Sequence, residues 1–461
     1  MKTNSEPSMD RPIWQDHREH LHLIAREALE AVDPFPSVIR HLSLKGDLLK
    51  VGSQEYELGD DSKVFVVGAG KAGVAMARGV ESVIGQKISA GIISVPALPE
   101  QNLEKIDFIC GGHPLPTEGS VEAGEALRDL LMETGPADVV LVLISGGGSA
   151  LLELPLDELQ LEDLVKTNDL LLKSGAPIHE FNAVRKELSL IKGGGLAQMA
   201  APARTAALIL SDVVGDHLDV IASGPTVPST SNAMDALEVL KRYELSSKVP
   251  RRVLDVVNSR IAVLESSVSE EIKTVEVNNI LIGSNSIAAS AAETKARVLG
   301  YHPKLLTTAL QGEASVVGRM IAKTLKGSDI RRTAQEVPIC LIMGGETTVS
   351  LKGDGIGGRN QELALSAAIE LDGEEGVAIM TFATDGIDGP TPAAGAIVTG
   401  QTLTKARSIG LDAMDSLMRN DSYSFFKVIG DAVITGPSGT NVNDLVFCVV
   451  YATEESTVLG I

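Results

Sequence analysis

Short apolar runs alternate along this chain with longer amphipathic segments, and this pattern predicts strands alternating with helices. Such an alternation favours a parallel sheet with right-handed crossovers between successive strands. In the first half we expect strands at 64–67, 91–95, 139–144 and 206–210, and helices at 10–32, 74–83, 121–132, 161–172 and 180–191.

A second alternating series follows a polar segment at 265–273, which we take as a domain boundary. The expected fold is therefore two α/β/α domains, with the active site in the cleft between them. Residues 1–265 would form a Rossmann-like parallel sheet and residues 266–461 a smaller α/β domain. In the second half we expect strands at 279–282, 338–343, 377–384 and 445–450, and helices at 287–299, 314–324 and 361–371.

Composition narrows the function classes. Aromatic residues make up only 3% of the 461 residues, so the cores must be built from Ala, Val, Leu and Ile, which suits buried parallel strands. The net charge of -21 speaks against a general nucleic-acid surface, although a small anionic substrate needs only a local cluster of donors. The three cysteines are far apart and fit neither a zinc site nor a disulfide scaffold. Because residues 1–10 are polar and no later segment reaches membrane-spanning length, we expect a cytoplasmic protein without a membrane partner.

The most informative motif runs from Gly68 to Gly73, directly after an apolar strand and before an amphipathic helix. Backbone N–H groups and the helix dipole converge at such a turn and favour an anion. Its spacing fits the dinucleotide fingerprint, but the second strand ends at 94–98 without the carboxylate that would hold the ribose. It is no P-loop either, since Ala72 follows the lysine. Nicotinamide binding, phosphoryl transfer and a tight turn with a solvated Lys71 all stay open at this point.

Three further motifs in the first half could bind anions or move a proton. The glycine run after the strand at 139–144 can form an anion-binding nest, and the absence of a GxSxG elbow argues against acyl transfer. Three cations, Arg185, Lys186 and Lys192, follow on a helix and a later turn, and two carboxylates follow the strand at 206–210. A plain turn, a solvated helix face or a helix cap would explain each motif without function. The candidate phosphate or substrate contacts are Gly70, Ser145, Gly146, Gly147, Gly148, Ser149, Arg185 and Lys192, with Asp212 as a base and Asp216 as a metal ligand.

In the second half Arg359 stands among glycines at a helix entry, where it could stabilise charge on a transferring phosphoryl group. Acidic turns at strand ends suit Mg²⁺ or hydroxyl groups of a nucleotide, and a glycine-rich segment at 436–444 could close over a nucleotide. A lone histidine, His113, in a Gly/Pro turn is more often structural. The candidate nucleotide contacts are Glu346, Asp385 and Asn441, and Asp388 is a second candidate metal ligand.

Taken together, these motifs resemble the glycerate 2-kinase family, whose C-terminal domain is named MOFRL. The resemblance extends in order over nearly the whole chain. It is carried by VVGAGKAG ending at Gly73, GGHPLPTEGS (111–120), SGGGSALL (145–152), NAVRKELSLIKGGGLA (182–197), LSDVVGD (210–216), GGETTVSLKGDGIGGRNQELAL (344–365), ATDGIDGPTPAAGA (383–396) and GPSGTNVND (436–444).

The resemblance implies phosphorylation of D-glycerate to 2-phosphoglycerate with ATP and Mg²⁺. It also implies that Lys71 and Arg359 are the key catalytic side chains, facing each other across the cleft, with Asp212 close to them. Lys71 would neutralise charge, Arg359 would stabilise the transition state and Asp212 would orient or deprotonate the attacking hydroxyl. The alternatives are an NAD(P)H-dependent hydroxypyruvate reductase and a non-catalytic nucleotide-binding module. We expect a monomer or homodimer.

Overall fold

A computed structural model describes residues 13–266 and 275–453 of the chain. It divides into two compact units, of which one spans Asp33–Gly283. The other consists of helix α1 (Ile13–Ala31), Val32 and the residues from Ser284 onward. No helix in these described ranges is long and apolar enough to cross a membrane.

This division differs from the boundary expected at 265/266. Of the polar segment at 265–273, only residues 265 and 266 are among the described residues. The expected helix start at residue 10 lies outside them. Strand β9 (Val277–Gly283), which we expected to open the second domain, instead pairs in parallel with β8 (Arg204–Leu210) of the first sheet. Helix α1 packs on α11 (Asn285–Val298) and therefore belongs to the second unit. Its buried stripe includes Leu21, Ile24 and Ala28.

The unit at 33–283 is built on a parallel sheet with the strand order β6-β5-β4-β7-β8-β9. Counted from β4, this is the order 3-2-1-4-5-6 of doubly wound dinucleotide-binding folds. The order reverses between β4 and β7, and the crevice at the carboxyl ends of these two strands is where such folds bind ligands. The remaining strand bounds are β4 (Val64–Ala69), β5 (Ile88–Val95), β6 (Ile106–Cys110) and β7 (Val139–Ile144).

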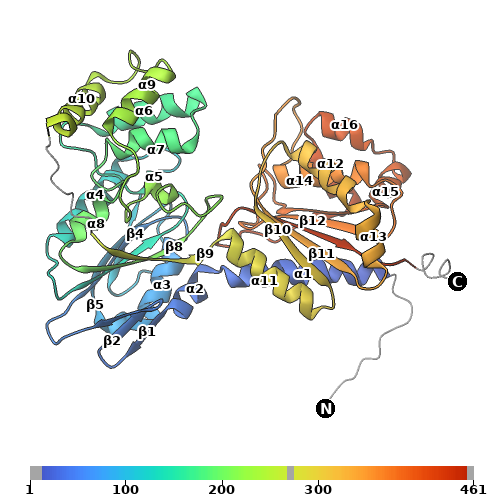
Figure 1. The fold of residues 1–461 in the computed structure, drawn as a ribbon, viewed down its shortest axis with the longest axis horizontal. Coiled ribbons are helices and arrows are strands. Elements are labelled where there is room, and N and C mark those ends of the chain that lie inside the picture. Colours follow the sequence, from blue (N-terminus) through green and yellow to red (C-terminus); the bar gives the residue numbers. More distant parts are fainter. Residues whose placement is uncertain (1–12, 267–274, 454–461) are drawn as a thin grey trace. The chain divides into compact units, whose positions relative to one another are not determined.

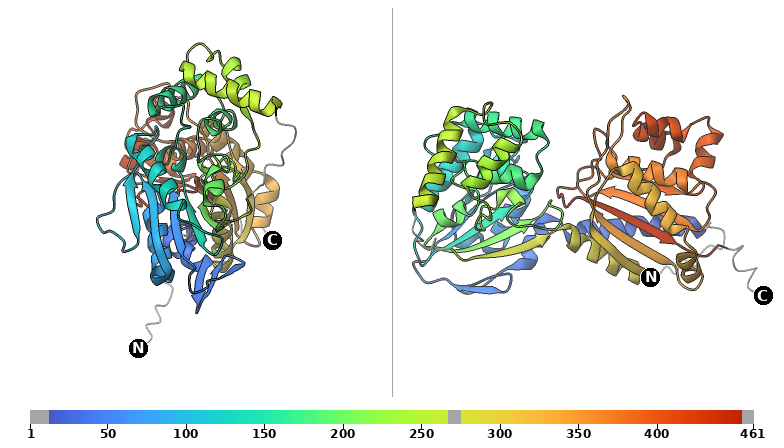
Figure 2. Two further views of the ribbon diagram at one scale, coloured as in Figure 1. Left: turned by 90° about the vertical axis from the view of Figure 1, so that its left-hand side faces the viewer. Right: turned by 45° about the horizontal axis from the view of Figure 1, so that its top comes forward.

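Helices cover this sheet and gather at one end of it, as the green ribbons of Figures 1 and 2 show. Two helices, α4 and α8, share a core with Phe65, Val67 and Val142 of the sheet. Helices α6, α7, α9 and α10 form a core of their own around Leu171 and Phe181. A small antiparallel sheet, β1-β2-β3, precedes the large one. The bounds are α2 (Pro34–His41), β1 (Leu42–Lys45), β2 (Leu48–Val51), β3 (Gln54–Glu57), α3 (Gly73–Ile84), α4 (Glu118–Leu131), α5 (Gly148–Leu151), α6 (Leu161–Ser174), α7 (Ile178–Lys186), α8 (Gly195–Ala200), α9 (Ala233–Arg242) and α10 (Arg251–Ser266), with 3-10 turns at Gly85–Lys87 and Ile221–Ser223.

The second unit holds a mixed sheet with the order β10-β11-β15-β12-β13-β14, in which only β10 and β11 pair in parallel among the described strands. Figure 1 shows α1 and α11 side by side along one face of this sheet, with α12 and α14 on the other. The first residue of β15, Asp444, lies opposite Gly345 at the end of β11 and Ala383 at the end of β12. This edge therefore gathers three strand termini. The bounds are β10 (His302–Leu310), α12 (Ala314–Leu325), α13 (Ser328–Ala334), β11 (Ile339–Gly345), α14 (Arg359–Glu370), β12 (Val377–Ala383), β13 (Gly395–Thr399), α15 (Thr402–Ser408), α16 (Ala413–Met418), α17 (Ser422–Ile429), β14 (Ala432–Val433) and β15 (Asp444–Val450).

Candidate active site

The glycine turn after β4 and the glycine run after β7 are joined by hydrogen bonds at the point where the strand order reverses. Lys71 donates its backbone N–H to the carbonyl of Gly146 (2.9 Å), and the backbone N–H of Ala72 donates to Ser145 Oγ (3.1 Å). Gly70 must lack a side chain, because a Cβ there would lie 2.0 Å from Ser145 Oγ. The predicted contacts Gly70, Ser145 and Gly146 thus share one loop pair, as the ends of adjacent parallel strands require.

Lys71, His113 and Asp212 surround this loop pair. A carbon built on Gly147 would lie 3.4 Å from Lys71 Cε and 3.0 Å from His113 Cδ2. A carbon built on Gly146 would lie 2.2 Å from Asp212 Oδ2. The Lys71 side chain is exposed, and within the described residues its ammonium forms no hydrogen bond or ion pair. Burial, followed by the charge of Lys71, lowers the pKa of His113, which keeps this imidazole neutral at neutral pH.

Ser149 belongs to a polar network rather than standing alone as a nucleophile. Its hydroxyl forms a very short hydrogen bond with Ser223, which donates in turn to Asn182 Oδ1 (2.9 Å). Its carbonyl accepts a hydrogen bond from Arg185 Nη2 (2.6 Å). Arg185 is buried with its guanidinium over the ring of Phe181, and burial lowers the pKa of Arg185. Arg185 therefore supports the glycine run directly.

Lys192 lies in a buried ion pair. Its ammonium is 2.5 Å from Glu153 Oε2, and both side chains are almost completely excluded from solvent. Burial lowers the pKa of Lys192 to about 8, although Glu153 raises it in part. Glu153 also accepts a hydrogen bond from Ser189 (2.6 Å). These contacts give Lys192 a structural role, and its predicted contact with substrate stays a prediction.

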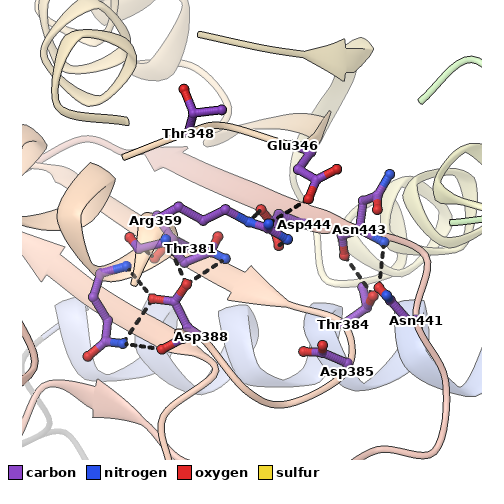
Figure 3. Close-up of polar contacts among 12 residues, drawn as sticks. Glu346, Thr348, Arg359, Thr381, Thr384, Asp385, Asp388, Asn441, Asn443 and Asp444 are labelled. Atoms are coloured by element: carbon purple, nitrogen blue, oxygen red, sulfur yellow. Dashed lines mark hydrogen bonds and ion pairs between the residues drawn. The ribbon is translucent and has the colours of Figure 1, made fainter. Parts of the chain in front are cut away.

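Arg359, the first residue of α14, is held by two carboxylates (Figure 3). Nε lies 2.6 Å from Asp444 Oδ2 and Nη2 lies 3.1 Å from Oδ1, while Nη1 lies 2.5 Å from Glu346 Oε1. Burial alone would lower the pKa of Arg359, but Asp444, Glu346 and Asp388 raise it above its ordinary value. Burial raises the pKa of Asp444 to about 6 against the opposing effect of Arg359. The guanidinium is thus permanently charged and fixed in orientation.

The other predicted residues of this unit fall at the same edge of the sheet. Asp388 anchors the start of α14, because its carboxylate accepts hydrogen bonds from the backbone N–H groups of Asn360 (3.0 Å) and Gln361 (2.8 Å). Asp385 Oδ1 accepts from the backbone of Ile387 (3.0 Å). Asn441 Oδ1 accepts from the backbone of Asn443 (3.1 Å). Figure 3 shows Asp385 and Asn441 near Thr384, away from Asp388.

A cavity of about 950 Å³ opens beside Arg359, and Glu346, Asp385, Asp388 and Glu362 also border it. Within the described ranges no group of three or more His, Cys, Asp or Glu side chains is arranged to hold a metal ion. Mg²⁺ does not require such a group, since it is usually bound by one or two carboxylates together with phosphate oxygens. Glu346 and Asp385, which are not fully buried, fit that pattern. Asp216 lies in the turn after Asp212 with a left-handed backbone (φ 54°).

Comparisons with known proteins identify the family of this chain. One family model, described as a domain of unknown function (DUF4147), matches residues 20–258, and the MOFRL family model matches residues 339–444. The glycerate 2-kinase of Pyrococcus horikoshii is 41% identical over 440 residues, which cover 95% of this chain and 98% of the relative. The chain belongs to the glycerate 2-kinase family.

Two further relatives bear on the activity within this family. The D-glycerate 2-kinase of Thermotoga maritima is 43% identical and covers 83% of this chain and 90% of its own length. A solved structure of glycerate kinase from that organism matches with a TM-score of 0.83 at 38% identity, covering 95% of this chain and all of the solved chain. A protein of Agrobacterium vitis named as a putative hydroxypyruvate reductase is 42% identical, covering 83% of this chain and 98% of its own.

Three polar residues near the candidate site are not among those expected from the sequence. Asp444 holds Arg359, and its signal was a carboxylate directly before the apolar run at 445–450. His113, for which the sequence favours a structural role, lies beside Lys71, and the sequence signal for it is the glycine pair before it. Ser223 links Ser149 to Asn182 from a segment that we had interpreted only as a turn.

Proposed function

We propose that this chain transfers the γ-phosphoryl group of ATP to the 2-hydroxyl of D-glycerate, with Mg²⁺ as the accompanying cation. The observation that carries the proposal is the exposed Lys71 ammonium, which has no hydrogen-bond or ion-pair partner in the described residues and lies at the ligand-binding point of a doubly wound sheet. An unpaired cation next to backbone amides of glycine loops suits a phosphoryl group or a carboxylate. The names of the similar proteins support the choice of glycerate as the acceptor.

In the proposed reaction the C2 oxygen of glycerate forms a bond to the γ-phosphorus while the bond from that phosphorus to the β–γ bridging oxygen breaks. ADP leaves, and the hydroxyl proton passes to Asp212. Lys71 balances negative charge on the anions bound at the Gly70 and Gly146 loops. His113 is neutral beside it and can accept or donate a hydrogen bond.

Arg359 is the second proposed catalytic cation, and it would stabilise charge on the transferring group. Its clamp by Asp444 and Glu346 fixes the guanidinium before substrate binds, which is the preorganisation that such stabilisation requires. Glu346, Asp385 and Asn441 are the proposed nucleotide contacts. Mg²⁺ would neutralise phosphate charge, and Glu346 and Asp385 suit it better than Asp388, whose oxygens already cap α14.

The test is direct. The purified protein is incubated with D-glycerate, ATP and MgCl₂, and the products are identified by ³¹P NMR, which separates 2-phosphoglycerate from 3-phosphoglycerate. A parallel incubation with hydroxypyruvate and NADH follows absorbance of the reduced cofactor. Formation of 2-phosphoglycerate without NADH oxidation is the expected result. A cytoplasmic location and a monomer or homodimer stay predictions, and light scattering of the purified protein tests the second.

Hydroxypyruvate reduction is the second candidate, and the same pair of incubations tests it. The doubly wound strand order and the putative hydroxypyruvate reductase among the relatives favour it. The end of β5 argues against nicotinamide binding, because the strand ends with Ser94 and Val95 and is followed by Pro96, so no carboxylate is present to bind the ribose. NADH oxidation without phosphoglycerate would overturn the kinase proposal.

A further inference from the structure

The side-chain amide of Asn285 is buried against the backbone that leads into β15. Its Nδ2 donates two hydrogen bonds, to the carbonyl oxygens of Val442 (2.8 Å) and Asp444 (3.0 Å). Asn285 is 5% exposed, so both bonds are shielded from water. The carbonyl of the residue whose carboxylate grips Arg359 is therefore fixed by a side chain that comes from α11, far away in the sequence.

The two hydrogen bonds donated by Nδ2 determine how the Asn285 amide is oriented. Oδ1 of Asn285 is buried and has no hydrogen-bond partner among the described residues. Turning the amide over would place that oxygen against two carbonyl oxygens and lose both hydrogen bonds. Residue 344 must be a glycine beside this oxygen, because a Cβ there would lie 1.7 Å from Asn285 Oδ1. An orphaned buried oxygen is a cost that the two donated bonds must offset.

The segment before Asp444 needs such support, because its backbone is unusual. Asn443 has a left-handed conformation (φ 66°), which is disfavoured for most residues that carry a side chain. Thr384, the residue directly after β12, holds Asn443, since its hydroxyl donates to the carbonyl of Asn443 (2.6 Å) (Figure 3). The same hydroxyl accepts from the backbone of Val442 (2.9 Å). Thr384 thus contacts Val442 and Asn443, while Asn285 contacts Val442 and Asp444.

We propose that Asn285 is a positioning residue for phosphoryl transfer, which keeps both carboxylate oxygens of Asp444 on Arg359. It touches neither substrate nor Arg359 and acts through the backbone at Asp444. Losing its donors lets that backbone shift, and because Nη2 of Arg359 is already 3.1 Å from Oδ1, a small shift would break this second hydrogen bond. The effect on turnover rests on the proposed function, whereas the effect on Asp444 does not.

The experiment compares Asn285→Ala and Asn285→Asp with Asn278→Ala. Asn278 is a matched control, because its Nδ2 also donates to a backbone carbonyl, that of Val51 (3.1 Å), in the other unit. We expect the Asn285 variants to lose at least about tenfold in kcat with KM for both substrates changed by less than about threefold, as for a contact that acts in the transition state. Asn278→Ala should keep kcat within about twofold. Unchanged turnover in both Asn285 variants would overturn the proposal.

A double-mutant cycle separates positioning from mere stabilisation. If Asn285 acts through Asp444, Asn285→Ala should lower kcat by less than about twofold when Asp444 has already been changed to Asn. The same tenfold loss in both backgrounds would mean a purely structural role. Independently of turnover, the pKa of the Asp444 carboxyl, followed by carbon NMR and assigned with Asp444→Asn, should rise in Asn285→Ala, because the carboxylate loses one of the two hydrogen bonds from Arg359 that lower this pKa. If the wild type had no kinase activity but Asn285→Ala still showed this pKa shift, the proposed function would be refuted and the positioning contact would stand.

Discussion

Arg359 and Asp444 form a bidentate ion pair, with Nε 2.6 Å from Oδ2 and Nη2 3.1 Å from Oδ1. Arg407 and Asp372 form a second bidentate pair in the same unit, with both distances 2.8 Å. The pairs differ in burial, because the side chain of Asp444 is 8% exposed and that of Asp372 is 36% exposed. The same bidentate geometry therefore occurs once at the candidate site and once at the surface. The exposed pair of Arg407 and Asp372 serves as a control for the buried pair of Arg359 and Asp444.

Arg359→Lys should lower kcat by about 100-fold or more, because a lysine cannot bind both oxygens of Asp444 and would lose its fixed orientation. Arg407→Lys should leave kcat unchanged, since water screens an exposed ion pair and Arg407 does not line the candidate site. The measurement is the initial rate of 2-phosphoglycerate formation at saturating D-glycerate and MgATP. Similar losses in both variants would show that the effect comes from the unit's stability and not from the site.

Lys71→Ala should also lower kcat by about 100-fold or more, because it removes a charge-balancing cation from the glycine loops. Its Tm should stay close to that of the wild type, since the side chain is exposed and unpaired in the described structure. Lys50→Ala, which changes an exposed lysine of β2, is the control for loss of positive charge. Near-normal turnover of Lys71→Ala would contradict the proposed role.

Several strands were predictable from a continuous apolar run, although β6, β10 and β13 were not expected. The expected strand at 139–144 matches β7 residue for residue, and the glycine motif at 68–73 marked the end of β4 correctly. Partners were not predictable. The apolar stripe of α1 indicated a buried face, but nothing in a single stripe says which sheet it covers, and it covers the later one. Likewise β9 looked like the start of a new domain, although its neighbour is β8.

The site was predictable to the same extent. Lys71 and Asp212 follow strands that the apolar pattern located, so their meeting at one edge follows from a parallel sheet. The ion pairs could not be predicted from the sequence, because their members are far apart in it. Asp444 lies 85 residues from Arg359 and Glu153 lies 39 residues from Lys192. A cation in a glycine-rich motif therefore looked equally functional whether it faced a ligand or a buried carboxylate.

Lys192→Met should lower the free energy of unfolding by about 3 kcal/mol, because it leaves the buried Glu153 without its partner. Lys173→Met is the control, since Lys173 forms an exposed pair with Asp169 that contributes only about 0.5 kcal/mol. Both values come from urea unfolding followed by circular dichroism. If Lys192→Met lost turnover but kept its stability, the predicted contact with substrate would replace the structural role.

Gly146→Ala should lower kcat by about 100-fold, because the added methyl carbon would lie 2.2 Å from Asp212 Oδ2 and must displace the proposed base. Gly59→Ala is the matched control, since a carbon there meets nothing closer than 3.7 Å. Both variants are compared by kcat and by Tm. A Gly146→Ala protein that turns over normally would show that Asp212 can move without cost and is not the base.

The ion pair of Arg359 and Asp444 predicts opposite responses of activity and stability to pH. Burial raises the pKa of Asp444 from 3.8 to about 6, so turnover should fall as pH drops through about 6 and the carboxylate that orients Arg359 is protonated. The raised pKa makes the opposite contribution to folding. Protonation favours the folded state, so this stability is present below pH 3.8 and is lost as pH rises through about 6.

The pH prediction is checked by measuring kcat and the free energy of unfolding for the wild type and Asp444→Asn across this range. Asp444→Asn cannot titrate at this position, so its acid limb near pH 6 should disappear. The stability of the wild type relative to this variant should decline as pH rises from about 4 to about 6, because only the wild type must ionise a buried carboxyl. An acid limb that persists in Asp444→Asn would assign the titration to another group. Because protonation would then leave the orientation of Arg359 unchanged, the pH dependence would no longer report on this ion pair.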